Sequence, residues 1–310
     1  MAVIEVEHLH KSYGDEVAVH DVSFTVGDGE IFGILGPNGA GKTTTVECLA
    51  GLRPADGGRV RVLGLDPRAD RAALRRRMGV QLQESGLPDK LRVREALDLF
   101  ASFHPAPADV PALLDRLGLA DRARARHKSL SGGQKQRLAI ALAMVGRPRV
   151  VVLDELTTGL DPHARRATWE LVEQIRDEGV TVVLVTHFME EAERLCDRVA
   201  LIDSGRLVAV DTPAALVGRA GQEQRMRFRP SGPLDEGGLR ALPEVSTLTW
   251  HGPQIELTGT GNLVGAVTSL LARRQVIAAD LRVDQATLDD AFIALTGRPH
   301  PPAEGPAHAR

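Results

Sequence analysis

Cysteine, aromatic residues and long apolar runs are all scarce in this chain of 310 residues. Its two cysteines, Cys48 and Cys196, lie far apart and form no C-x-x-C pair, which disfavours a metal site or a redox motif. Both fall in apolar stretches that favour helix, so we expect buried thiols and a reducing, cytosolic environment. Aromatic residues make up 3% of the chain and the net charge is −3, and both values argue against a nucleic-acid-binding surface.

Membrane-crossing and export signals are also missing from the sequence. No segment approaches the roughly 18 consecutive apolar residues that a membrane-spanning helix needs. The first five residues, Met1 to Glu5, lack the basic flank and apolar core of a signal peptide, so we expect none. If the protein works at a membrane, another chain must provide the part that crosses it.

The order of apolar patterns predicts an α/β protein of two domains. Residues 3–26 alternate between apolar and polar, which predicts antiparallel strands. The β-branched runs 150–153, 180–185 and 199–202 are typical of parallel strands buried on both faces, and helical patterns separate them. The core is therefore a doubly wound sheet, with an inserted helical subdomain at about 84–146.

The pattern of predicted helices and strands changes near residue 220. Residues 221–297 predict a small α+β domain, with strand-like pieces followed by a helix near 261–274, a strand and a second helix near 286–296. The last residues, 298–310, are rich in proline, glycine and alanine, so we expect disorder there. The predicted domains are 1–220 and 221–297.

A glycine-rich segment matches the pattern G-x-x-x-x-G-K-[ST] directly after the apolar run 31–35 and before a predicted helix. This strand–loop–helix context is the one a phosphate-binding P-loop requires, because inward-facing N–H groups and the helix N-terminus together hold an anion. We expect Lys42 to reach the β- and γ-phosphates of a nucleotide, and Thr43 to offer its hydroxyl to Mg²⁺. The segment consists of Gly36, Pro37, Asn38, Gly39, Ala40, Gly41, Lys42, Thr43 and Thr44.

A second segment has the form of an anion-binding helix N-terminus. Ser131 is a good N-cap, and the two glycines after it allow a ligand to approach the backbone closely. An apolar helical run follows at 138–144. The segment consists of Leu130, Ser131, Gly132, Gly133 and Gln134.

With both segments in this order and spacing, residues 1 to about 220 resemble the ATP-binding subunit of an ABC transporter. The resemblance implies a P-loop ATPase core with an antiparallel β subdomain and a helical subdomain. It also implies a homodimer in which each ATP lies between the P-loop of one subunit and the Ser131 segment of the other. Neither subunit alone would then complete a site.

The resemblance extends to two carboxylates that follow the buried strand at 150–153. Asp154 corresponds to the family's Mg²⁺-holding aspartate, and Glu155 to the general base that polarises the attacking water. A carboxylate at the carboxyl end of a buried parallel strand can face a nucleotide there. The family usually has proline after the glutamate; this chain has Leu156, which puts local rigidity in doubt but not the chemistry.

Four further residues fit family motifs. Gln83 resembles the glutamine that senses Mg²⁺ or the attacking water, with Gln81 as a neighbouring candidate. Asp161 resembles the aspartate that contacts the opposite subunit's site. His187 resembles the histidine that bonds the γ-phosphate and helps to hold Glu155, and Tyr13 the aromatic residue that stacks on adenine. We expect catalytic roles for Glu155, His187, Gln83 and Lys42, and metal contacts from Thr43, Gln83 and Asp154.

The C-terminal segment, Ala286 to Gly297, resembles the tail of exporter ATPases of the daunorubicin-resistance type. This implies an exporter of drugs or other hydrophobic compounds, in which the chain hydrolyses ATP with Mg²⁺ at the cytoplasmic face of the membrane and drives a separate permease. The predicted permease dock is the groove near Gln83, between core and helical subdomain. The alternatives are an importer ATPase with a regulatory C-terminal domain, or a soluble ABC ATPase acting on DNA or the ribosome.

Overall fold

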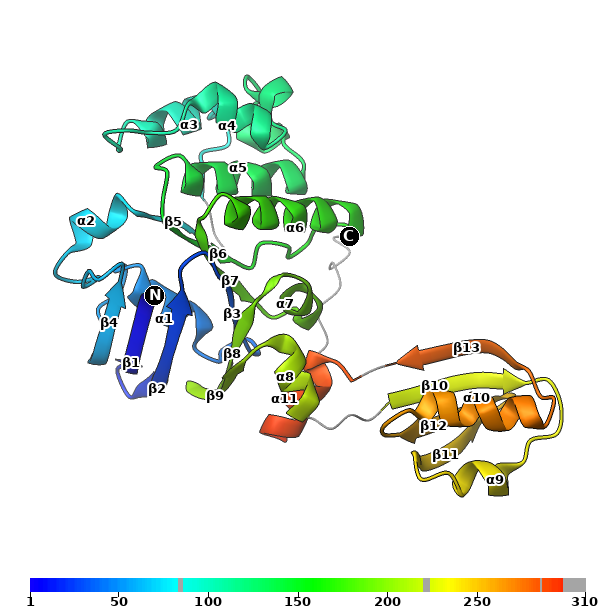
Figure 1. Ribbon diagram of the computed structural model, residues 1–310. Helices are drawn as coiled ribbons and strands as arrows, with labels where there is room; N and C mark the ends of the chain where they lie inside the picture. The colour runs from blue at the N-terminus through cyan, green and yellow to red at the C-terminus, as the bar shows by residue number, and fades with distance from the viewer. Residues whose placement is uncertain (83–85, 220–223, 285, 298–310) are drawn as a thin grey trace. The chain divides into compact units, whose positions relative to one another are not determined.

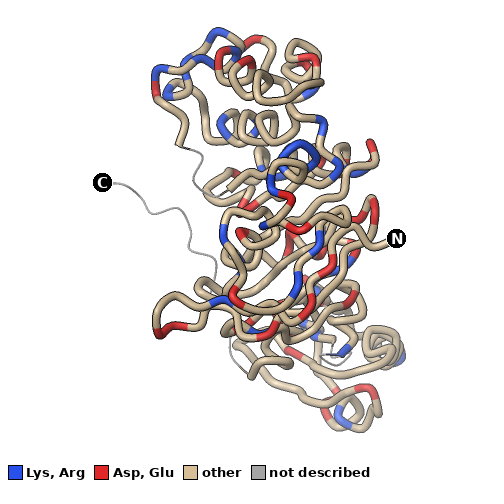
Figure 2. The backbone as a smooth tube through the Cα atoms, turned by 90° about the vertical axis from the view of Figure 1, so that its left-hand side faces the viewer, with Lys and Arg blue, Asp and Glu red and all other residues tan. Residues whose placement is uncertain are grey.

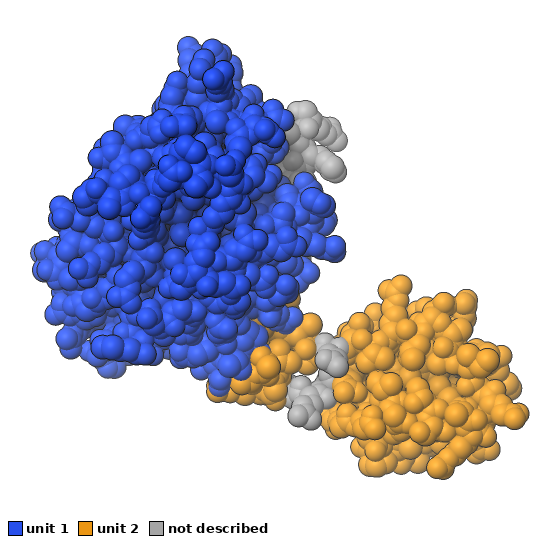
Figure 3. Space-filling model, turned by 45° about the horizontal axis from the view of Figure 1, so that its top comes forward, with its two compact units in different colours: residues 1–213, 301–310 blue, residues 214–300 orange. Residues whose placement is uncertain are grey.

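The structure is a computed structural model and describes residues 1–82, 86–219, 224–284 and 286–297. Contacts divide the chain into two compact units, one formed mainly by Met1–Pro213 and the other by Ala214–His300 (Figure 3). Helix α8 (Pro213–Arg219), apart from its first residue, falls in the second unit by this division, whereas the predicted boundary near residue 220 puts it in the first. The domain boundary therefore stays a prediction.

The first unit contains a nine-stranded sheet in the order β4-β1-β2-β9-β8-β3-β7-β6-β5 (Figure 1). Its antiparallel part pairs β1 with β2, as the alternating pattern predicts, and also pairs β1 with β4. Its parallel part pairs β3 with β7 and β8, β7 with β6, and β6 with β5. The strands are β1 (Ala2–Tyr13), β2 (Glu16–Gly27), β3 (Ile31–Leu35), β4 (Gly57–Val62), β5 (Met78–Gln81), β6 (Val150–Asp154), β7 (Thr181–Thr186), β8 (Arg198–Asp203) and β9 (Arg206–Asp211).

Every residue of β3, β6 and β7 is buried, because helices cover both faces of the parallel part. Phe24 of β2 and Phe32 of β3 stack with ring centroids 5.1 Å apart inside the main hydrophobic core. The helices are α1 (Lys42–Leu49), α2 (Arg71–Arg75), α3 (Val93–Ala101), α4 (Val110–Arg116), α5 (Gly132–Met144), α6 (Pro162–Asp177) and α7 (Met189–Leu195), with 3-10 turns at Ala120–Arg122 and His127–Ser129.

Helices α3, α4 and α5 form the predicted helical subdomain. Helix α3 packs against α4 and α5, and α5 also packs against α6 and strand β5. The predicted fold class, an α/β core with an antiparallel part and a helical subdomain, is confirmed. The predicted buried thiols are confirmed too: Cys48 and Cys196 are free and buried, and burial raises the pKa of Cys48 to about 11.

The second unit holds a four-stranded antiparallel sheet in the order β11-β12-β10-β13, with α9 and α10 between strands. This βαββαβ order is the ferredoxin-like arrangement. Its core residues, such as Met226 and Phe228, alternate with arginines on the other face of β10. The elements are β10 (Gln224–Pro230), α9 (Glu236–Arg240), β11 (Val245–His251), β12 (Gln254–Gly259), α10 (Leu263–Arg273), β13 (Ala278–Asp284) and α11 (Leu288–Thr296).

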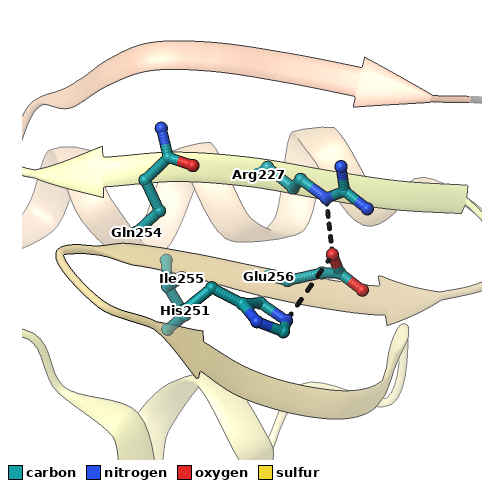
Figure 4. A pocket seen from close by; sticks show the side chains of 5 residues that line it. All are labelled: Arg227, His251, Gln254, Ile255 and Glu256. Carbon is teal, nitrogen blue, oxygen red and sulfur yellow. Dashed lines mark hydrogen bonds and ion pairs between the residues drawn. The ribbon is translucent and has the colours of Figure 1, made fainter.

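The second sheet carries an open, charged groove of about 350 Å³. Figure 4 shows Glu256 between Arg227 and His251, and Glu256 forms ion pairs with both of them and with Arg225.

Basic and acidic residues are interspersed along the chain (Figure 2). Among the described residues, no helix has both the length and the apolar character to cross a membrane.

Candidate active site

The carboxyl ends of three adjacent parallel strands bring the predicted catalytic segments together. In the sheet order β3-β7-β6, Leu35 pairs with Thr186, and Val185 pairs with Asp154. The P-loop follows β3, His187 follows β7, and Glu155 follows Asp154 at the end of β6. Ligands of open α/β sheets bind at this edge, so sequence positions far apart converge on one place.

The P-loop backbone requires glycine at two positions. Gly36 has φ +155, and a Cβ there would lie 2.0 Å from the carbonyl oxygen of Ile202. Gly41 caps α1 with φ +97, and a Cβ there would lie 2.4 Å from the carbonyl oxygen of Ala18. Side chains at these positions would displace neighbouring backbone, so the loop keeps its inward curl only with glycine.

Lys42 lies inside the P-loop. Its Nζ donates to the carbonyl oxygens of Gly36 (2.8 Å) and Pro37 (3.0 Å), and its side chain is buried. Burial lowers the pKa of Lys42, while Glu155 and Asp154 act in the opposite direction. An ammonium group so placed, beside two carboxylates and at a helix N-terminus, is suited to phosphate.

Asp154 has the surroundings that a cation site requires. Its side chain is buried and, among the described residues, neither of its carboxylate oxygens has a hydrogen-bond partner. The pKa of Asp154 is raised to about 6, chiefly by burial and then by the charge of Glu155, while Lys42 opposes the rise. Buried carboxylate oxygens without partners are costly unless they bind a cation, so the Asp154 side chain fits a magnesium ion.

No group of three or more metal-ligating side chains occurs in the described part of the chain. Magnesium at nucleotide sites usually takes one or two carboxylates together with phosphate oxygens and water, so a single aspartate is sufficient. Thr43, in the first turn of α1, is exposed and available as a second protein ligand. Gln83, the predicted third contact, lies outside the described residues.

Gln81 plays a structural part. Its Oε1 accepts the backbone N–H of Asp154 at 3.1 Å, and its Nε2 donates to the carbonyl oxygen of Leu82 at 2.8 Å. The side chain is buried, so it fixes the end of β6. These two hydrogen bonds explain why Gln81 is buried here, and neither requires contact with a nucleotide.

Glu155 and His187 form a pair. The Nδ1 of His187 lies 3.1 Å from the Oε1 of Glu155, and both side chains are mostly buried. The hydrogen bond from His187 lowers the pKa of Glu155, so this carboxylate is ionised at neutral pH. Glu155 has φ +48, a left-handed conformation that is uncommon for a non-glycine residue and concentrates at functional sites. Its N–H donates to the carbonyl of Val185 at 2.8 Å.

The Ser131 segment begins helix α5 with a capping box. Ser131 Oγ accepts the N–H of Gln134 at 3.3 Å, and Gln134 Oε1 accepts the N–H of Ser131 at 3.0 Å. Ser131 and Gly132 are exposed. Helix α5 packs on α3, α6 and β5, whereas α1 packs on β2 and β4, so the two anion-binding helices belong to different parts of the unit.

Asp161 and Tyr13 occupy well-defined positions. Asp161 caps α6, and its Oδ1 accepts the N–H groups of His163 (3.0 Å) and Ala164 (2.9 Å), which lower its pKa. Tyr13 is 39% exposed at the end of β1, with the Arg53 guanidinium carbon 5.3 Å from its ring centroid. The sequence did not predict that Arg53, which follows α1 in the chain, would lie beside Tyr13.

The sequence profile of the family described as "ABC transporter" matches residues 19–158. Nod factor export ATP-binding protein I of Mesorhizobium japonicum is 39% identical over 95% of this chain and 87% of its own length. The linearmycin resistance ATP-binding protein LnrL of Bacillus subtilis is 33% identical over 96% and 99%.

The chain belongs to the ABC transporter family of ATP-binding subunits. A solved dimeric structure of the ATP-binding cassette MJ0796 in a post-hydrolysis state, bound to ADP and Pi, is 25% identical. It has a TM-score of 0.60 and covers 67% of this chain and 98% of its own. The chain is thus an ATPase of a family whose solved members include this dimeric cassette and cbiO1 of Clostridium perfringens, which is part of the ABC transporter complex cbiONQ.

Proposed function

We propose that this chain is the ATP-hydrolysing motor of an exporter and drives a separate membrane permease. The observation that carries the proposal is the cluster formed by the P-loop, Asp154 and the Glu155–His187 pair at one edge of the sheet. The names of its relatives, which concern Nod factor export and linearmycin resistance, support export over import. Their alignments span nearly the whole chain, which disfavours a soluble, non-transport ABC ATPase.

Each residue of the site has a separate role in the proposed binding and hydrolysis of ATP. Lys42 and the P-loop amides would hold the phosphates, and Asp154 with Thr43 and Gln83 would hold Mg²⁺, which when bound would neutralise charge on the phosphates. Glu155, kept ionised by His187, orients and deprotonates the attacking water. Tyr13 stacks on adenine.

Two copies of the chain would form the working unit. Because Ser131 and Gly132 are exposed and begin a helix remote from α1, they are free to meet a nucleotide held by another copy. Asp161 would contact the opposite site while it caps α6. We therefore propose a homodimer with two ATP molecules between its subunits, peripheral to the cytoplasmic face of a membrane, docked to its permease near Gln83 and without a nucleic-acid partner.

The variant Glu155→Gln tests this assignment. A general base contributes about 10²–10⁴-fold to rate, so turnover should fall by that factor while ATP affinity is kept. Turnover is measured as phosphate release and affinity as equilibrium binding of labelled ATP. Glu170→Gln, an exposed position on α6, is the control. Wild-type turnover in Glu155→Gln would remove Glu155 from the catalytic role.

A further inference from the structure

Glu191 is a buried carboxyl group that the proposed chemistry does not use. It lies on α7 and is fully inaccessible to solvent. Its Oε1 accepts the indole N–H of Trp169, on α6, at 3.0 Å. Burying a carboxyl group is costly, and an apolar side chain would pack α7 against the core without that cost. The position therefore calls for a role beyond packing.

The other groups around Glu191 belong to the catalytic loops. Burial raises the pKa of Glu191, while the nearby hydroxyls of Thr186 and Thr157 and the charge of Arg165 act in the opposite direction. Among the described residues, Glu191 Oε2 and Thr157 Oγ1 have no hydrogen-bond partner. Thr186 directly precedes His187, and only Leu156 separates Thr157 from Glu155. The Glu191 carboxyl group is thus bonded to helix α6 and lies near the segment after Glu155 and the segment before His187.

Helix α6 is tied to the same place by a second contact. The Arg165 guanidinium carbon lies 5.2 Å from the ring centroid of Phe188, and that ring lies 4.1 Å from the ring of His187. The backbone N–H of Phe188 donates to Thr186 Oγ1 at 3.0 Å. Helix α6 begins at Pro162, directly after its cap residue Asp161, so these contacts join the helix that Asp161 caps to the segment that carries His187.

We infer that Glu191, held by Trp169, is a positioning residue that sets the distance between His187 and Glu155. The inference rests on the proposed function, because it assumes that this pair performs hydrolysis. Glu191 is inaccessible to solvent, so it does not contact the nucleotide and acts only through the two loops. It should therefore affect the rate of hydrolysis and leave nucleotide affinity alone.

The first test compares Glu191→Ala, Glu191→Gln and Trp169→Phe with the exposed control Glu170→Gln. A misplaced catalytic group costs up to about 10²-fold, so Glu191→Ala should lower kcat by about 10-fold to 100-fold. Its ATP dissociation constant should stay within about two-fold. Glu191→Gln keeps an acceptor for the indole N–H and should restore part of kcat, while Trp169→Phe should lower it. Wild-type kcat in Glu191→Ala would overturn the inference.

The second test separates positioning from a general loss of stability. In a His187→Ala background, adding Glu191→Ala should lower kcat by less than two-fold, because the group it positions is gone. A further loss as large as that in the wild-type background would overturn the inference. If Glu191→Ala fails to fold, Trp169→Phe enters the same cycle. Wild-type turnover in Glu155→Gln would instead be a failure of the proposed function.

Discussion

Replacement of Asp154 by asparagine should stabilise the nucleotide-free protein while it damages the site. Asp154 is buried, its carboxylate oxygens have no partners among the described residues, and its pKa is raised from 3.8 to about 6, chiefly by burial. One pKa unit corresponds to about 1.4 kcal/mol, so ionising this group in the folded chain costs about 3 kcal/mol. Asparagine has the same shape and carries no charge.

The pH dependence follows from the sign of the shift. Below about pH 4 the carboxyl group is protonated in the folded and unfolded chains alike, so it does not destabilise the fold. As the pH rises from about 4 to about 6, the unfolded chain ionises first, and the free energy of unfolding of the wild type falls by about 3 kcal/mol. The advantage of Asp154→Asn should therefore be near zero at about pH 4 and full above about pH 6.

Urea unfolding in the presence of a chelator, from about pH 4 to pH 8, measures this difference. The exposed substitution Asp121→Asn is the control and should show no pH-dependent gain. With Mg²⁺ and ATP the order should reverse, because ligand stabilises only the protein that binds it. A variant no more stable than the wild type at pH 7.5, or a gain equal at both ends of the range, would refute the reasoning.

Three further substitutions test the nucleotide site. Lys42→Ala should weaken ATP binding by about 10-fold to 100-fold, measured by equilibrium dialysis, because it removes charged hydrogen bonds to phosphate; the exposed Lys90→Ala should change nothing. Tyr13→Ala should weaken ATP binding by about 5-fold to 150-fold in the same assay, whereas Tyr13→Phe keeps the ring and should retain affinity. Gly41→Ala should abolish ATP binding and lower the melting temperature, because its Cβ would lie 2.4 Å from a backbone oxygen. The matched Gly29→Ala has φ +71 in open space and should show only modest backbone strain.

Local patterns predicted most of the fold. Apolar β-branched runs are typical of strands buried on both faces, and β6 and β7 follow them closely. Helix α9 was not predicted, because Gly237 and Gly238 make its sequence read as a loop. Tertiary contacts override that preference: Asp235 caps the helix by accepting the N–H of Gly238 at 2.9 Å, and Leu239 enters the core.

The candidate site was predictable where the chemistry imposes a linear motif. The P-loop and His187 each follow a buried strand and Asp154 ends one, so the topology of parallel strands brings them together. The burial of Glu191 was not predicted, because it stands among the acidic residues Glu190 and Glu193, which are exposed, and such a cluster is typical of a solvated helix face. Its position one turn before Leu195 is the signal that could have revealed it, since residues at i and i+4 share a helix face.

The most direct test of the central claim is to load the Glu155→Gln variant with ATP and use it as bait in detergent extracts of native cells. Slow hydrolysis should keep the ATP-bound dimer closed, and mass spectrometry identifies the proteins that purify with it. The account predicts a membrane-spanning permease in the eluate, absent when Lys42→Ala is the bait. Recovery of ribosomes or DNA-repair proteins without a membrane protein would contradict it.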